Sequence, residues 1–85
     1  MDLGTPSSYL SLTTGTPVIS SDEQELGRVE EVRAAADLDI FDGIVITGGS
    51  AGRRFVSADH VREIFDRGVL LTLSAAEAGS LPEHG

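Results

Sequence analysis

Residues 15–34 read GTPVISSDEQELGRVEEVRA, and this stretch decides the fold. Pro17 has no amide hydrogen and suits the first position of a strand, which Val18 and Ile19 continue. Residues 20–24 are polar, with side chains that hydrogen-bond their own backbone, so they predict a turn. The stretch therefore predicts a strand, a turn and a second strand. Later segments are expected to pair with this hairpin.

The second half of the stretch fits two secondary structures. Leu26, Val29, Val32 and Ala36 fall at helical spacing. A strand keeps Val29 and Val32 on one face if a β-bulge absorbs the extra residue between them. Gly27 disfavours a helix interior. The pattern alone leaves helix and strand open, and the family resemblance given below favours the strand.

Further strands are predicted downstream. Residues 44–47 form a β-branched run typical of a buried strand, and residues 54–57 return as its antiparallel partner after a glycine-rich turn. Residues 61–65 and 69–73 predict another hairpin. About five or six short strands at this spacing predict an all-β fold, a small closed or partly open antiparallel barrel.

The turns and the two ends give further expectations. Gly68 is expected to take the positive φ that a tight hairpin needs. Residues 9–12 alternate like a strand. Ser74 and Glu77 form a capping box that predicts a helical turn ending at Gly79, with Leu81 folded onto the barrel mouth.

One domain over residues 9–81 is expected from the length of the chain. Residues 1–8 and 82–85 are expected to be flexible ends.

Composition narrows the function classes. A net charge of −8, from 14 acidic and 6 basic residues, opposes binding to nucleic acid and to anionic membranes. The absence of cysteine suits a reducing compartment. The longest apolar run, residues 69–71, is too short to span a bilayer, and the N-terminus lacks a signal-peptide pattern. We therefore expect a cytoplasmic protein that does not insert into membranes.

Candidate chemical sites are weak. Residues 48–52 with Arg53 and Arg54 could cradle an anion, but the Lys-Ser/Thr ending of a P-loop is missing, so a hairpin loop is favoured. Asp37, Asp39 and Asp42 do not match a calcium loop, because the distal bidentate glutamate is missing. The sequence predicts no catalytic residue, no cofactor and no metal site.

Several ordered pieces of the chain resemble the PRC-barrel domain. They are Gly15-x-Pro17-Val18-Ile19 with the acidic turn after it, Leu26-Gly27-Arg28-Val29-Glu30-Glu31-Val32, Phe41-Asp42-Gly43-Ile44-Val45-Ile46, Arg54-Phe55-Val56-Ser57-Ala58, and Val61-x-x-Ile64-x-x-x-Gly68-Val69-x-Leu71. The family includes the cytoplasmic domain of the photosynthetic reaction-centre H subunit, the C-terminal domain of the ribosome maturation factor RimM and many short stand-alone bacterial proteins.

The chain looks most like the stand-alone bacterial proteins of that family. It departs from the family at the first turn, where Asp22-Glu23 stands in place of a common Asp-Gly. The resemblance implies an adaptor barrel, and it supplies no catalytic residues.

The function expected from these observations is a non-enzymatic protein-interaction module that self-associates, with a homodimer as the expected oligomer and an unknown protein partner. A small domain gains stability from an interface, and strand edges can be extended by another chain. Residues expected to contact the partner are Ile44, Ile46, Phe55, Val69 and Leu71. The alternative is a small-ligand or anion-binding protein that uses residues 48–54, with Arg53 and Arg54 as the anion-binding residues.

Overall fold

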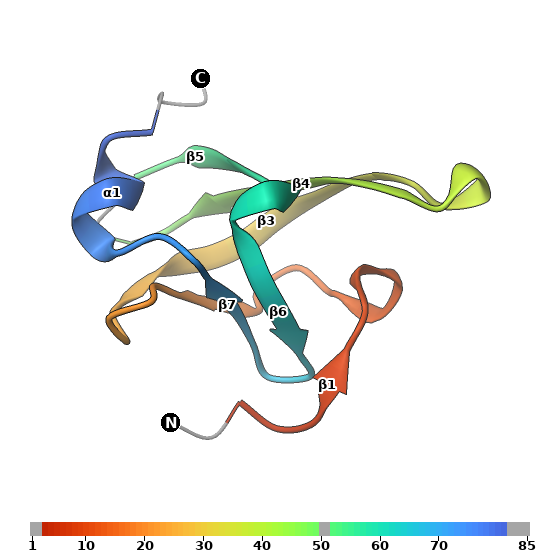
Figure 1. The fold of residues 1–85 in the computed structure, drawn as a ribbon, viewed down its shortest axis with the longest axis horizontal. Coiled ribbons are helices and arrows are strands. Elements are labelled where there is room, and N and C mark those ends of the chain that lie inside the picture. The colour runs from red at the N-terminus through yellow and green to blue at the C-terminus, as the bar shows by residue number, and fades with distance from the viewer. Residues whose placement is uncertain (1–2, 50–51, 82–85) are drawn as a thin grey trace.

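The computed structural model describes residues 3–49 and 52–81, which form one seven-stranded sheet with a short helix (Figure 1). The structure is therefore mostly β, as predicted. The strands are β1 (Pro6–Ser7), β2 (Pro17–Ile19), β3 (Glu25–Ala35), β4 (Ile40–Thr47), β5 (Arg54–Ser57), β6 (Val61–Phe65) and β7 (Gly68–Leu71). The helix is α1 (Ala75–Gly79), and single 3-10 turns are η1 (Tyr9–Ser11), η2 (Ala36–Leu38) and η3 (Ala58–His60).

The sheet has the strand order β1-β6-β7-β2-β3-β4-β5 and is not closed, since β1 and β5 lie at its two edges. All neighbouring pairs are antiparallel except β2 and β7, where Val18 lies opposite Val69 and Ile19 opposite Leu70 in a parallel pair. Two expectations are thereby corrected: the described residues hold seven strands instead of five or six, and the sheet is mixed. The seventh strand is the two-residue β1.

Residues 25–33 are extended, so the helical alternative is wrong. Val29 lies opposite Ile46 and Glu31 lies opposite Val45, which leaves Glu30 as the extra residue of a β-bulge. The bulge lets Val29 and Val32 face the core together, although three positions separate them. A spacing that imitates a helix therefore arises here from a strand with one inserted residue.

Two glycines lie where the backbone comes close to a neighbour. Gly27 has a φ of 155°, and a Cβ there would lie 2.6 Å from the carbonyl oxygen of Thr47. Gly68 does not have the predicted positive φ. Its side of the hairpin is instead filled by Leu3, whose Cδ2 would lie 2.6 Å from a Cβ at that position. A side chain at position 68 would therefore require Leu3 to move.

The described part of the N-terminal segment, residues 3–8, is bonded to the β6–β7 hairpin. In β1, Pro6 pairs with Phe65 and Ser7 with Ile64. The N–H of Thr5 donates to Asp66 Oδ1 at 3.0 Å. Residues 9–11, predicted as extended, form η1 instead, and the Ser8 hydroxyl accepts from the N–H of Leu10.

The core lies between the strands and is closed at one end by α1. Ala78 of α1 is fully buried in it, and Leu81 packs against it as predicted. The predicted capping box is confirmed: the Ser74 hydroxyl accepts from the N–H of Glu77, and the Glu77 carboxylate accepts from the N–H of Ser74. The predicted flexible end at residues 82–85 lies outside the described residues. The buried core residues are Val18, Leu26, Val29, Ile44, Ile46, Val56, Ile64, Val69, Leu71 and Ala78.

Candidate interaction surface

A two-stranded arm extends from the body of the sheet. We define the arm as residues 31–42, which comprise the end of β3, the turn η2 and the start of β4. On its β4 side, the pairing with β5 stops at Gly43, which lies opposite Ser57. Figure 1 shows the arm projecting away from α1, with η2 at its tip. The arm therefore extends the β3–β4 pair beyond the part of β4 that is paired with β5.

Tyr9 of η1 supports the arm from one face. Its ring stacks on Phe41 of β4, with ring centroids 5.1 Å apart and an angle of 7° between the planes. Its hydroxyl donates to Asp39 Oδ1 at 2.8 Å, and this hydrogen bond is the main cause of the raised pKa of Tyr9. Asp39 has a φ of 54°, which an aspartate tolerates better than most residues. These contacts fix the tip of the arm relative to η1.

Exposed apolar residues adjoin Tyr9 and Asp39 in the chain. Among the described residues, the exposed large hydrophobic side chains are Leu10 at 64%, Leu38 at 66% and Ile40 at 45%. Leu10 follows Tyr9 in the chain, and Leu38 and Ile40 flank Asp39, so the Tyr9–Asp39 hydrogen bond brings all three to one end of the molecule. We call these three residues the apolar end. A group of this kind is typical of a protein-contact site.

One edge of the arm also lacks a strand neighbour among the described residues. The backbone of Val29 is still bonded on the β2 side, since its N–H donates to Thr16 at 2.9 Å and its carbonyl accepts from Gly15 at 2.7 Å. Beyond that point, β3 pairs with β4 alone. Along this segment, Arg33 Nε lies 3.0 Å from Glu31 Oε2. The open edge therefore carries two opposite charges two positions apart.

Most of the residues predicted to contact a partner are buried in the core. Ile44, Ile46, Val69 and Leu71 are 0% exposed and belong to the core, and Phe55 is half-buried. The side chains of the first four therefore fill the core, where a partner bound to the surface does not reach them. Strand alternation does turn every second residue outward, but on β4 the outward residue Val45 is buried as well. The apolar content of a strand therefore identifies the strands of the core and does not identify a surface that contacts a partner.

The apolar end was missed by sequence reasoning because its members are isolated residues in turns. Leu38 and Ile40 lie in a link rich in aspartate, and the alternation of residues 9–12 predicts a strand at Leu10. The available signal was the presence of large apolar side chains between Asp37, Asp39 and Asp42, where a solvated loop has no need of them.

The predicted anion loop has a different arrangement from a cradle. Arg53 binds the Glu30 carboxylate with two hydrogen bonds, from Nε to Oε2 at 2.7 Å and from a terminal nitrogen to Oε1 at 3.2 Å. Glu30 is also the main cause of the raised pKa of Arg53. Arg54 is half-buried, with its Nε shielded from solvent. An anion at Arg53 would have to displace Glu30. Residues 50 and 51 of this loop lie outside the described residues.

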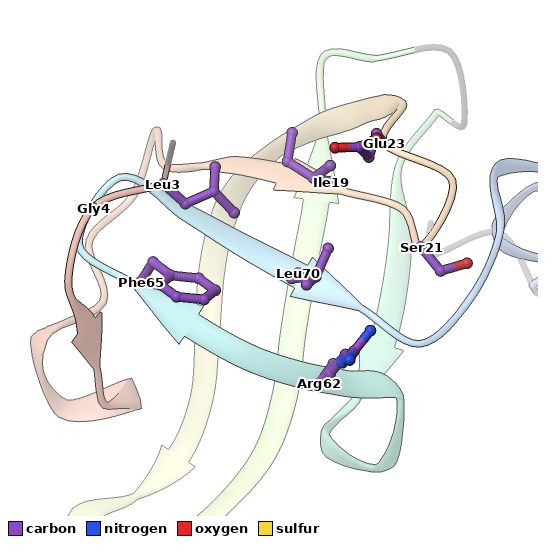
Figure 2. Close-up of a pocket in the computed structure, with 8 residues that line it drawn as sticks. All are labelled: Leu3, Gly4, Ile19, Ser21, Glu23, Arg62, Phe65 and Leu70. Carbon is purple, nitrogen blue, oxygen red and sulfur yellow. The ribbon is translucent and has the colours of Figure 1, made fainter. Parts of the chain in front are cut away.

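A hollow of about 380 Å³ lies on the outer face of β2, β7 and β6 (Figure 2). Ile19 and Leu70 lie side by side in it, with Leu3 and Phe65 toward one end and Arg62 and Ser21 toward the other. Leu3 and Gly4 belong to the N-terminal segment that is bonded to the β6–β7 hairpin, so this segment already forms one wall of the hollow. The hollow has both apolar and polar lining residues, and the described lining residues include no cluster of reactive groups.

In residues 3–49 and 52–81, no three His, Cys, Asp or Glu side chains are grouped in a way that could hold a metal ion. No helix of this part combines the length and hydrophobicity needed to cross a bilayer. Comparison of the chain with protein-family models and with curated proteins gives no match.

Proposed function

We propose that this chain is a non-enzymatic protein-interaction module of PRC-barrel type that associates with itself. The observation that carries the proposal is the arm, which combines an open strand edge with the exposed side chains of Leu10, Leu38 and Ile40. Backbone groups and apolar side chains of this kind bind another protein surface. The chain offers them at one end of the molecule, away from α1.

The family part of the proposal rests on the first hairpin and its bulge. The resemblance requires an extended β3, and β3 is extended with Glu30 as the bulged residue. In the β3 segment that carries the resemblance, the carbonyl oxygen of Thr47 lies close to Gly27. The open sheet order and the parallel β2–β7 pair are compatible with a partly open barrel.

Sedimentation velocity over concentrations from about 1 µM to about 1 mM tests the self-association. We expect the sedimentation coefficient to rise with concentration for the wild-type chain. The triple variant L10S/L38S/I40S should associate more weakly and should keep its melting temperature, because all three side chains are exposed in the monomer. A wild-type chain that stays monomeric at high micromolar concentration would contradict self-association.

A further inference from the structure

We propose that a second copy of this chain binds along the open edge of β3, antiparallel to it, with the two Val32 residues opposite each other. This inference rests on the proposed self-association and names the surface that carries it. It uses backbone groups of the arm and the charges of Glu31 and Arg33.

The backbone of Val32 faces the open edge. Successive residues of a strand reverse both the face of the side chain and the edge to which the N–H and C=O point. Val29 and Val32 both face the core because of the bulge at Glu30, so their backbone groups point to the same edge. At Val29 that edge is closed by Gly15 and Thr16. At Val32 the described residues place no strand there, so its N–H and C=O are available to another chain.

The sequence around Val32 is complementary to itself in one direction. Antiparallel pairing centred on Val32 places Glu31 opposite Arg33 of the second copy, and Arg33 opposite its Glu31. These two pairs would be of the non-hydrogen-bonded type, in which facing side chains are closest. Parallel pairing would instead bring like charges together at both positions, which is unfavourable. The charges therefore select a second copy in antiparallel orientation.

The same register sets the extent of the contact. Because Val29 is bonded to residues 15 and 16, the new pairing covers residues 30–34 of each copy. Beyond residue 34, each arm passes the loop at residues 13–16 of the other copy. In this register the exposed Leu38 and Ile40 follow the paired segment along the same arm and would lie at the margin of the contact.

Charge reversal tests this arrangement. The variants are E31R, R33E and the double variant E31R/R33E, compared with the wild type by sedimentation equilibrium. Each single variant should raise the dissociation constant about tenfold or more, because it creates two like-charge pairs. The double variant should associate like the wild type. An equimolar mixture of the two single variants should form heterodimers, since opposite charges then face each other at both positions.

The control is E63R, which reverses an exposed glutamate on β6 and changes the net charge by the same amount as E31R, from −8 to −6. Two copies of a less negative chain repel each other less, so the change in net charge alone should strengthen the association of E31R. Weaker association of E31R would therefore not be explained by its net charge. Thermal unfolding of every variant shows whether it is folded. If one single variant is less stable, the mixture and the double variant still test the pairing of residues 31 and 33.

Three results would overturn the inference. If the wild type associates and both single variants associate equally well, the β3 edge is not the contact, although self-association stands. If the single variants dissociate but neither the mixture nor the double variant recovers, the antiparallel register is wrong. If the wild type is monomeric throughout, this inference and the self-association part of the proposed function fail together.

Discussion

The carboxylate of Asp22 accepts a hydrogen bond from the N–H of Ala75 at 3.0 Å, and this contact joins the β2–β3 turn to the first turn of α1. The same Oδ1 atom accepts from the hydroxyl of Ser20, which is fully buried. The Ser20 hydroxyl in turn accepts from the N–H of Gln24 at 2.9 Å. One carboxylate therefore organises the β2–β3 turn and anchors the C-terminal helix that closes the core.

This arrangement predicts that stability falls in acid. The Ser20 hydroxyl first, and the Ala75 N–H second, lower the pKa of Asp22 below its ordinary value of 3.8. The unfolded chain therefore takes up the proton at higher pH than the folded chain. The stabilisation is complete above the ordinary pKa and is lost as the pH falls below it, through the folded pKa. Denaturant unfolding of D22N should show lower stability than wild type at pH 7 and a smaller difference near pH 3.

Glu77 contributes to the same acid sensitivity. Hydrogen bonding to Ser74 lowers its pKa too, so D22N should keep part of the pH dependence and D22N/E77Q should lose more of it. The control is D37N, which removes an exposed carboxylate on η2. If D37N flattened the pH profile as much as D22N, general charge repulsion would explain the acid sensitivity instead of the Asp22 network.

Glu23 predicts a stabilising substitution in the same turn. It has a φ of 64°, in the left-handed region that costs a residue with a side chain about 1–2 kcal/mol. The resembling family commonly has glycine at this place. Glycine removes the strain but adds entropy to the unfolded chain, so E23G should stabilise the fold by about 0.5–1 kcal/mol. That corresponds to a rise in Tm of about 2–8 °C.

Calorimetry of E23G and E25G checks this prediction. Glu25 begins β3 and has an ordinary extended backbone, so E25G should destabilise the chain. If both variants lowered Tm equally, Glu23 would not be strained in solution.

The sequence predicted local features well where a single physical reason explains the residue type at a position. The capping box at Ser74 and Glu77 depends on spacing within a single turn, and it is present. The bulge in β3 followed from two valines that must share a face. The strands at residues 54–57 and 61–65 also lie where their β-branched and aromatic residues predicted them.

Long-range features could not be predicted in this way. The parallel β2–β7 pair joins segments about fifty residues apart, and nothing in either segment encodes the direction of pairing. Tyr9, in the 3-10 turn at residues 9–11, contacts Phe41 and Asp39, which lie about thirty residues downstream. The candidate interaction surface depends on that same contact. Its residues therefore had no recognisable spacing in the sequence.

The close approach at Gly27 predicts a large loss of stability from a small change. G27A would place a Cβ 2.6 Å from the carbonyl oxygen of Thr47, a backbone atom that cannot move without shifting β4. Overpacking of this kind costs about 1–3 kcal/mol, and the φ of 155° adds strain for any side chain. Urea unfolding should show the midpoint shifted to lower denaturant by a corresponding amount.

G79A is the matched control for G27A. Gly79 ends α1, and a Cβ there would meet no heavy atom within 4 Å. The same glycine-to-alanine change should therefore be neutral, or should stabilise by up to about 1 kcal/mol through helix propensity. Equal destabilisation by G27A and G79A would show that Thr47 does not approach β3 as closely as the structure has it.

Tyr9 offers a direct optical measurement of the arm, because it is the single tyrosine of the chain and tryptophan is absent. Its hydrogen bond to Asp39 raises its pKa above the ordinary value of 10.0, and burial and the charge of Asp39 act in the same direction. Titration of the absorbance of the phenolate should therefore give a pKa above 10.0 for the wild type. D39N removes the charge, so it should lower that pKa toward the ordinary value. L38S leaves the Tyr9–Asp39 pair intact and should not change it. A wild-type tyrosine that titrates normally, or one that is unaffected by D39N, would mean that η1 does not hold the tip of the arm, and the apolar end would then have no fixed geometry to offer a partner.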